Sequence, residues 1–136
     1  MKSREALIKL RRFEVDEKRQ KVADIEVMIS EFMRMLDDLD RQIKIEQERA
    51  GVSDINHYAY PTFAKAAMQR KDNLASSIDD LQNSLENAKD ELANSYEELK
   101  KIEMLEERGI AEERDKRDKR EQIQLDEFAA KPQFSI

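Results

Sequence analysis

The sequence predicts an all-α protein, a long antiparallel two-helix coiled-coil hairpin with a helical or frayed C-terminal overhang. Two observations predict this class. The 136 residues include only two Gly and two Pro, too few for a β fold that turns about every ten residues. Charged residues make up 41% of the chain, as in many disordered proteins, yet apolar residues recur at intervals of seven, a pattern that a disordered chain has no reason to keep.

The first predicted helix covers residues 3–49. Its seam consists of residues at intervals of seven, called a, and the residues three further on, called d. Nine of these twelve positions are apolar, and the exceptions are Arg11, Lys18 and Glu46. The a series is Ile8, Val15, Val22, Ile29, Leu36 and Ile43, and the d series is Arg11, Lys18, Ile25, Phe32, Leu39 and Glu46.

A connector over residues 51–60 separates this helix from a second, which starts at residue 61. Gly51 favours the left-handed conformation that ends a helix, and Pro61 suits the first turn of the next one. In the second seam, ten of twelve positions are apolar. The a series is Ala64, Lys71, Ile78, Leu85, Leu92 and Leu99, and the d series is Ala67, Leu74, Leu81, Ala88, Ser95 and Ile102.

The short connector lets the second helix fold back on the first, with paired residue numbers that sum to about 110. Val22 then meets Ala88, and Lys21 meets Glu91. The second helix outlasts its partner, so we expect a hairpin over residues 1–107 and a charged overhang over residues 108–136. Gly109 weakens the overhang by about 1 kcal/mol. We expect disorder beyond Ala130, because Pro132 stops any helix.

Composition excludes most catalytic sites. The chain has no Cys, and its two isolated glycines cannot form a phosphate-binding loop. A two-helix hairpin has no water-shielded pocket, so His57 is better read as a solvent-facing loop residue than as an acid, base or ligand. Adjacent carboxylates on a helix point apart, so a solvated acidic face is favoured over a metal site. These carboxylates are Asp37, Asp38, Asp40, Asp79 and Asp80. We expect no catalytic residue, metal or cofactor.

Apolar residues also lie beside the seam. Met28, Met33 and Met35 flank it on the first helix, and Phe63 and Met68 flank it on the second. They have two interpretations: they widen the seam against small residues, or they form a strip toward the hairpin tip to which a partner docks. The small residues are Ala75, Ser77 and Ser84, and Tyr58 and Tyr60 would extend the strip into the connector.

The opposite end is basic. Residues 1–21 contain eight Lys or Arg and four acidic residues. Arg11 and Lys18 replace apolar seam residues, so we expect looser pairing there. This end is either a solvated surface or a basic tip that meets an acidic partner. Nucleic acid is disfavoured, because acidic residues interleave and no aromatic stacking platform accompanies the basic residues.

Three segments resemble the FliJ family of flagellar type III export proteins, in its alphaproteobacterial form: MKSREALIKLRRFEVDEKRQKVADIE, GVSDINHYAYPTFAKAAMQRKDNL and AKDELANSYEELKKIEMLEER. The resemblance covers residues 1–114. It implies a non-enzymatic component of flagellum biogenesis, and thereby of chemotaxis. One end of such a hairpin enters the export ATPase hexamer. The other end contacts the cytoplasmic domain of the transmembrane export gate, and family members also handle export chaperones.

The resemblance, combined with the hairpin geometry, implies two binding regions. The ATPase-facing end comprises Arg4, Arg11, Arg12, Lys18, Ile102 and Arg108. The gate-facing strip comprises Met28, Met33, Met35, Leu39, Phe63 and Met68. We expect a cytoplasmic protein at the membrane-embedded export apparatus, without membrane insertion, because no apolar run approaches the roughly 18 residues of a membrane span. The alternative is a generic coiled-coil scaffold that self-associates through the methionines.

Overall fold

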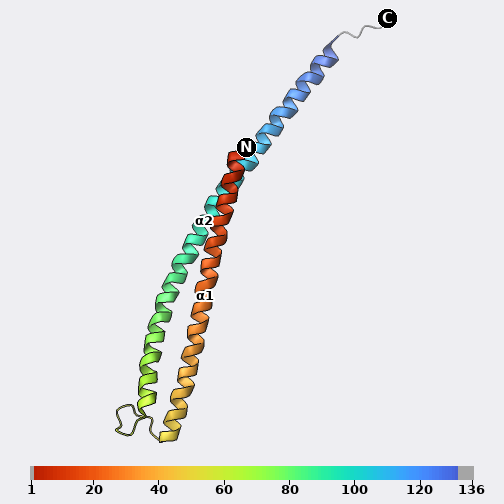
Figure 1. Ribbon diagram of the computed structural model, residues 1–136. Helices are drawn as coiled ribbons and strands as arrows, with labels where there is room; N and C mark the ends of the chain where they lie inside the picture. Colours follow the sequence, from red (N-terminus) through yellow and green to blue (C-terminus); the bar gives the residue numbers. More distant parts are fainter. Residues whose placement is uncertain (1, 132–136) are drawn as a thin grey trace. The chain divides into compact units, whose positions relative to one another are not determined.

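The computed structural model describes residues 2–131 of the chain. It contains two helices, α1 (Lys2–Ala50) and α2 (Thr62–Ala130), and no strand within the described range (Figure 1). The predicted all-α fold of two long, mutually packed helices is confirmed. The expectation of disorder beyond Ala130 falls almost entirely on residues 132–136, which lie outside the described residues.

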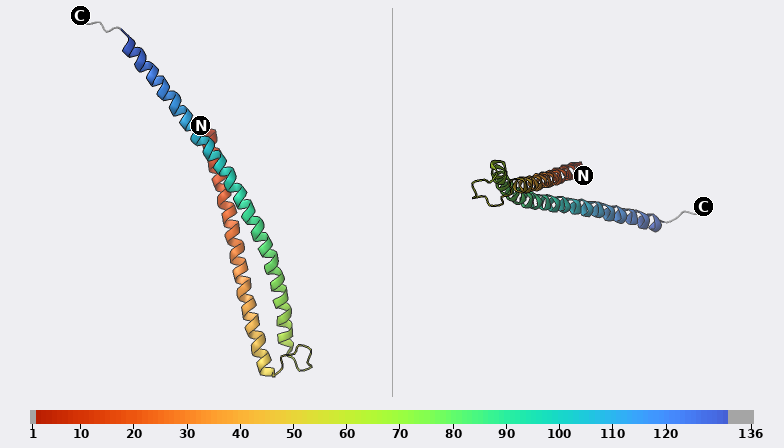
Figure 2. Two further views of the ribbon diagram at one scale, coloured as in Figure 1. Left: turned by 180° about the vertical axis from the view of Figure 1, so that it is seen from behind. Right: turned by 90° about the horizontal axis from the view of Figure 1, so that it is seen from below.

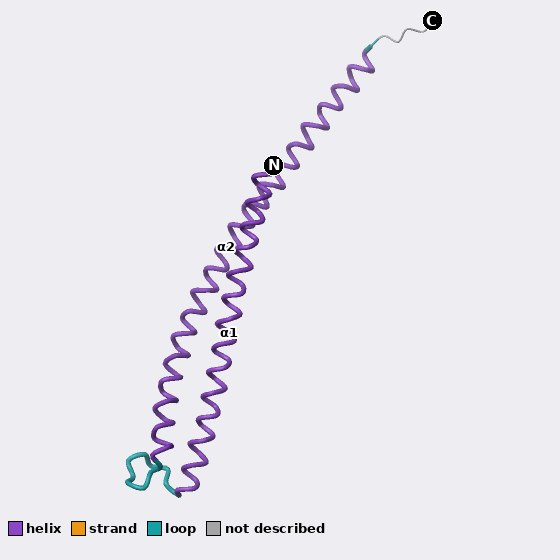
Figure 3. The backbone as a smooth tube through the Cα atoms, viewed as in Figure 1, coloured by secondary structure: helices purple, strands orange, loops and turns teal. Residues whose placement is uncertain are grey.

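The connector between the helices begins with a well-defined helix stop. Gly51 has a φ of 68°, which is the left-handed conformation predicted for it. Its N–H donates to the Glu48 carbonyl, and the N–H of Val52 donates to the Gln47 carbonyl, each at 3.3 Å. These two bonds satisfy carbonyls that the end of α1 would otherwise leave unpaired. At the other side, Pro61 lies just before α2 and its carbonyl accepts a hydrogen bond from the Lys65 N–H. Figure 3 shows the connector as a loop between the two helices.

Burial follows the two predicted seams. All twelve seam positions of α1 and all twelve of α2 are buried or partly buried. Of the twelve apolar residues that are buried within residues 2–131, eleven occupy seam positions, and Tyr60 in the connector is the other. The heptad spacing therefore identifies the buried face of both helices, as expected when a 3.5-residue repeat keeps one stripe against a partner helix.

The structure divides into two compact units. The connector unit comprises Val15–Asn94, and the terminal unit comprises Met1–Glu14 together with Ser95–Ile136. In the connector unit, α1 and α2 run antiparallel on either side of the connector (Figure 2). One core cluster combines Val22, Ile25 and Ala88, and another combines Leu39, Ile43 and Ala67. Both clusters contain pairs whose numbers sum to about 110, so the predicted register holds in this unit.

In the terminal unit, residues 2–14 of α1 pair with α2 around Ile8 and Leu99, which are both buried. The Arg4 guanidinium still contacts α2 near Glu106. Beyond this contact, residues 111–131 of the chain are all exposed. α2 stays helical through this exposed stretch, which is one of the two states expected of the overhang. The boundary expected between residues 107 and 108 stays a prediction.

Candidate functional site

Arginines of α1 form ion pairs with carboxylates of α2 in the terminal unit. The Arg11 guanidinium lies 2.9 Å from Glu14 on its own helix and 3.2 Å from Glu98 on α2. The Arg12 guanidinium lies 3.6 Å from Glu103. The hydrogen bond to Glu14, with the nearby charge of Glu98, raises the pKa of Arg11. Arg11 therefore bridges the helices as a cation, where looser pairing was expected.

The terminal unit is electrically balanced rather than basic. Its residues include fourteen Lys or Arg and fourteen Asp or Glu. The basic residues at the start of α1 face acidic residues of α2, so the positive charge seen in the linear sequence is neutralised in the fold. Arg12 and Arg108 are the most available of the residues expected at the ATPase-facing end, because both are exposed, whereas Arg4, Arg11 and Ile102 are partly buried.

Arg4 occupies a place on α2 that a glycine opens. Its guanidinium donates to the Leu105 carbonyl at 3.2 Å and lies 3.6 Å from the Glu106 carboxylate. A Cβ at Gly109 would come within 2.6 Å of the Arg4 Nη1 atom. Gly109 thus weakens α2 locally but also provides room for a contact between the helices.

Gly109→Ala is expected to stabilise α2 by up to about 1 kcal/mol, because alanine has the higher helix propensity. The same change displaces the Arg4 guanidinium, whose flexible end can move away. The net gain in the melting temperature, measured by circular dichroism, should therefore be larger in an Arg4→Ala background than in the native one. Equal gains in the two backgrounds would show that Arg4 and Gly109 are not coupled.

Lys18, also expected at the ATPase-facing end, lies in the connector unit. Its ammonium is 3.1 Å from Glu91, and the ammonium of Lys21 is 3.4 Å from the same carboxylate. The predicted contact between Lys21 and Glu91 is thus confirmed. The hydrogen bond and charge of Lys18, followed by those of Lys21, lower the pKa of Glu91.

The lowered pKa of Glu91 predicts an acid-dependent contribution to stability. A carboxylate with a depressed folded-state pKa stabilises the fold above its unfolded-state pKa, and this contribution disappears as the pH falls through the folded-state value. Glu91→Gln should therefore lower the melting temperature at neutral pH and have no effect at a pH below the folded-state pKa. A deficit that persists unchanged in acid would rule out the ionic origin.

A small apolar groove opens on α2 in the terminal unit. It has a volume of about 290 Å³ and is lined by Lys101, Met104, Leu105 and Arg108. Met104 and Leu105 are 54% and 50% exposed. The sequence reasoning singled out Arg108 among these four and included Met104 and Leu105 only within a range around residues 102–114, although two adjacent apolar residues outside the heptad seam are a more specific signal.

The residues of the expected gate-facing strip separate into two groups in the connector unit. Met28, Met33, Met35 and Phe63 are exposed, which leaves them available to a partner. Leu39 is buried at the seam in a cluster with Ile43 and Ala67, and Met68 packs against that cluster. The two tyrosines expected to extend the strip differ in the same way, since Tyr58 is 96% exposed and Tyr60 is 9% exposed.

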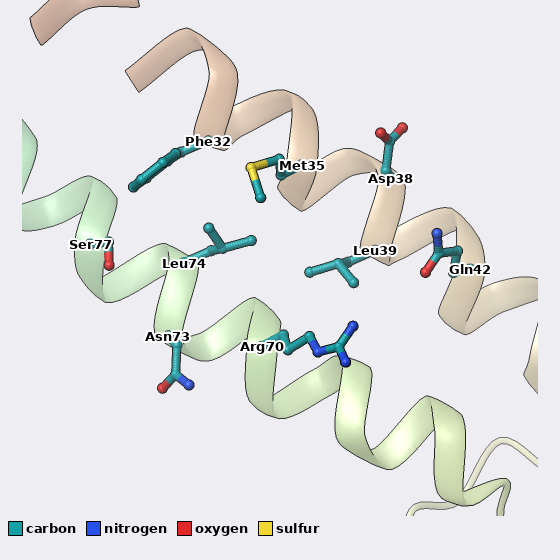
Figure 4. Close-up of a pocket in the computed structure, with 9 residues that line it drawn as sticks. All are labelled: Phe32, Met35, Asp38, Leu39, Gln42, Arg70, Asn73, Leu74 and Ser77. Atoms are coloured by element: carbon teal, nitrogen blue, oxygen red, sulfur yellow. The ribbon is translucent and has the colours of Figure 1, made fainter. Parts of the chain in front are cut away.

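A larger groove lies between the helices of the connector unit, with a volume of about 490 Å³. Figure 4 shows Phe32 and Met35 of α1 directed toward Leu74 of α2, with Leu39 beside them. Met35 and Ser77 line the same groove, which is the pairing expected if methionines widen the seam against small residues. The groove is also open to a partner, so both interpretations of the methionines remain.

Residues 2–133 match the FliJ family, described as the flagellar FliJ protein. This match covers nearly the whole chain, including every residue of α1 and α2. The chain belongs to the FliJ family. It is therefore a flagellar export component. No curated protein and no solved structure matches the chain.

In this FliJ-family chain, His57 takes part in local backbone structure. Its Nδ1 accepts a hydrogen bond from the Ala59 N–H at 3.0 Å, and its ring stacks on Tyr58. Between residues 2 and 131, no group of three or more His, Cys, Asp or Glu side chains is placed to hold a metal ion. Neither described helix combines the length and apolar character needed to cross a membrane.

Proposed function

We propose that this FliJ-family protein is a non-enzymatic cytoplasmic adaptor that couples the flagellar export ATPase hexamer to the cytoplasmic domain of the export gate. It would also assist export chaperones in handling their substrates. The family match over residues 2–133 is the observation that carries this proposal. The chemical difference between the two units supports it, because each unit offers a different kind of surface to a partner.

The terminal unit would face the ATPase. Arg12 and Arg108 offer exposed charge, and the groove at Met104 and Leu105 offers apolar area between Lys101 and Arg108. Arg4 and Arg11 are already paired with carboxylates of α2. Their role would be to hold the two helices together. Arg108 and Lys101 would contact acidic groups of the ATPase, and so would Arg12, whose side chain is 61% exposed although it lies 3.6 Å from Glu103. Exposed charges of this kind mainly affect the association rate and orientation.

The connector unit would face the gate. Met28, Met33, Met35 and Phe63 provide exposed and adaptable apolar contacts. Buried Leu39 and partly buried Met68 would support this surface from below rather than contact the gate themselves.

The test of the ATPase assignment is ATP turnover by the cognate export ATPase at increasing adaptor concentration. The native chain should raise turnover, and the double variant Arg12→Glu, Arg108→Glu should require about tenfold more protein for the same effect. Arg34→Glu is the matched control, because Arg34 is an exposed basic residue of α1 in the connector unit. No stimulation by the native chain at saturation would refute the coupling role.

The test of the gate assignment is capture of the purified gate domain by the immobilised adaptor. Met33→Ser combined with Phe63→Ser should reduce capture and leave the stimulation of ATP turnover intact. Arg12→Glu combined with Arg108→Glu should instead leave capture of the gate domain intact and impair the stimulation of ATP turnover. If both variants impair both activities equally, the two units do not have separate partners. The same capture with purified export chaperones tests the substrate-handling role.

The net charge of the connector unit argues against the alternative function, a scaffold that self-associates. The connector unit has eleven Lys or Arg against seventeen Asp or Glu, so it carries the entire net charge of −6. Two copies that meet through the methionines would bring these like charges together. Sedimentation velocity should accordingly show a monomer at all concentrations, and a concentration-dependent dimer would favour the scaffold.

A further inference from the structure

The groove between the helices of the connector unit is an apolar surface that the two helices leave uncovered. Phe32 and Leu74 occupy seam positions, yet both are only partly buried, and Met35 beside them is 50% exposed. All three line the groove with Leu39 (Figure 4). In the two clusters on either side, seam residues such as Val22 and Ile43 are 8% and 7% exposed. The seam is thus more tightly closed on both sides of the groove than at Phe32 and Leu74.

Exposed carboxylates lie next to the groove on both helices. Asp38 of α1 and Asn73 of α2 line its two edges. One heptad further along each helix, Glu31 and Asp80 occupy the equivalent positions and are exposed. Neither forms an ion pair with any residue in the described range 2–131. Within the lining, Asp38 and Arg70 are the two charged residues, and Asp38 pairs with Arg41, so the acidic character comes from Glu31 and Asp80 beside the groove.

We propose that this groove docks one amphipathic helix of a partner protein, with apolar residues along one face and Lys or Arg along both flanks. A groove between two long helices runs along them, and a third helix buries an apolar stripe in it with the same spacing of side chains. The flanking cations then face Glu31 on one side and Asp80 on the other. A second copy of this chain is disfavoured as the occupant, because it brings six further negative charges.

The inference rests on the proposed function for the identity of the partner, because Met35 and Leu39 also belong to the strip assigned to the export gate. Its chemistry can be tested without any flagellar protein. The probe is a fluorescent synthetic peptide of Leu and Lys, about 18 residues long, with leucines on one helical face. A scrambled peptide of the same composition, which lacks the apolar face, is the control for charge alone.

Fluorescence anisotropy should show saturable binding of the amphipathic peptide to the full chain and at least about tenfold weaker binding of the scrambled one. Met35→Lys should weaken binding of the amphipathic peptide by about tenfold, because it places a cation at the apolar floor. Val27→Lys is the matched control, since Val27 is 56% exposed on the same helix and does not line the groove. Glu31→Lys with Asp80→Lys should weaken binding as well.

Equal binding of the two peptides, or equal effects of Met35→Lys and Val27→Lys, would overturn the inference. A different outcome is that the chain is found as a dimer that Met35→Lys dissociates and the peptide leaves intact. That result would assign the groove to a second copy and would equally overturn the inference. If the peptide fails to bind and the gate domain is still captured, the groove inference is wrong and the adaptor function stands. If the peptide binds and the gate is not captured, the adaptor function is wrong and the groove inference stands.

Discussion

Ala88→Asp is expected to destabilise the connector unit by at least about 3 kcal/mol, because it places a carboxylate without a partner in an apolar core. Ala88 is 1% exposed and belongs to the cluster of Val22 and Ile25, which Leu85 also contacts. The small side chain lets the helices approach closely, so no space exists for the larger group or for its water. Urea unfolding followed by circular dichroism measures the loss.

Ala93→Asp is the control for this substitution. Ala93 is exposed on the same helix, so the change there costs only helix propensity, below about 1 kcal/mol. The difference between the two variants isolates burial of the charge. Similar stabilities for the two variants would mean that Ala88 does not face α1, and the antiparallel register would then be wrong.

Tyr60→Ala is expected to cost about 2–3 kcal/mol of unfolding free energy, the second-largest effect that we predict. Tyr60 ends the connector and is 9% exposed. Its hydroxyl accepts a hydrogen bond from the Gln47 side chain at 2.9 Å and donates to the Met68 sulfur at 3.5 Å. The tyrosine therefore links the end of α1 to the first turns of α2, and its removal leaves both ends less constrained.

Two further variants separate the contributions of Tyr60. Tyr60→Phe keeps the ring and removes the hydroxyl bonds, so about 1 kcal/mol should be lost. Tyr58→Ala should change the stability little, because Tyr58 is 96% exposed. Thermal unfolding distinguishes the three variants, and a loss in Tyr58→Ala as large as that in Tyr60→Ala would indicate that the connector is stabilised by another means.

The heptad repeat predicted the parts of this fold that depend on residue spacing. Apolar residues such as Ile25 and Ala88 recur with the period of the helix seam, and burial against a partner helix is the physical reason for that recurrence. Gly51 was predictable for a different reason, since a left-handed residue at a helix end strongly favours glycine. These two signals are local, so they can be seen without coordinates.

The features that the sequence did not reveal depend on contacts between distant residues. Arg11 at a seam position suggested loose pairing, because its partner Glu98 cannot be recognised until the helices are aligned. Tyr60 lies in a connector without periodicity, and nothing local distinguishes it from exposed Tyr58. The groove at Phe32 and Leu74 results from imperfect closure of the seam, which a pattern of residue types cannot show.

Both units have ion pairs between the helices, but ten of the twelve apolar residues buried in the described part of the chain lie in the connector unit, so a single change of solvent should affect the two units differently. Sulfate screens the ion pairs of both units, and residues 2–14 depend more on theirs, which are the pairs of Arg4, Arg11 and Arg12 with α2. The same anion strengthens apolar burial, which tightens the layers around Val22 and Ile43. The ionic composition of the surroundings can therefore shift the relative stability of the two units.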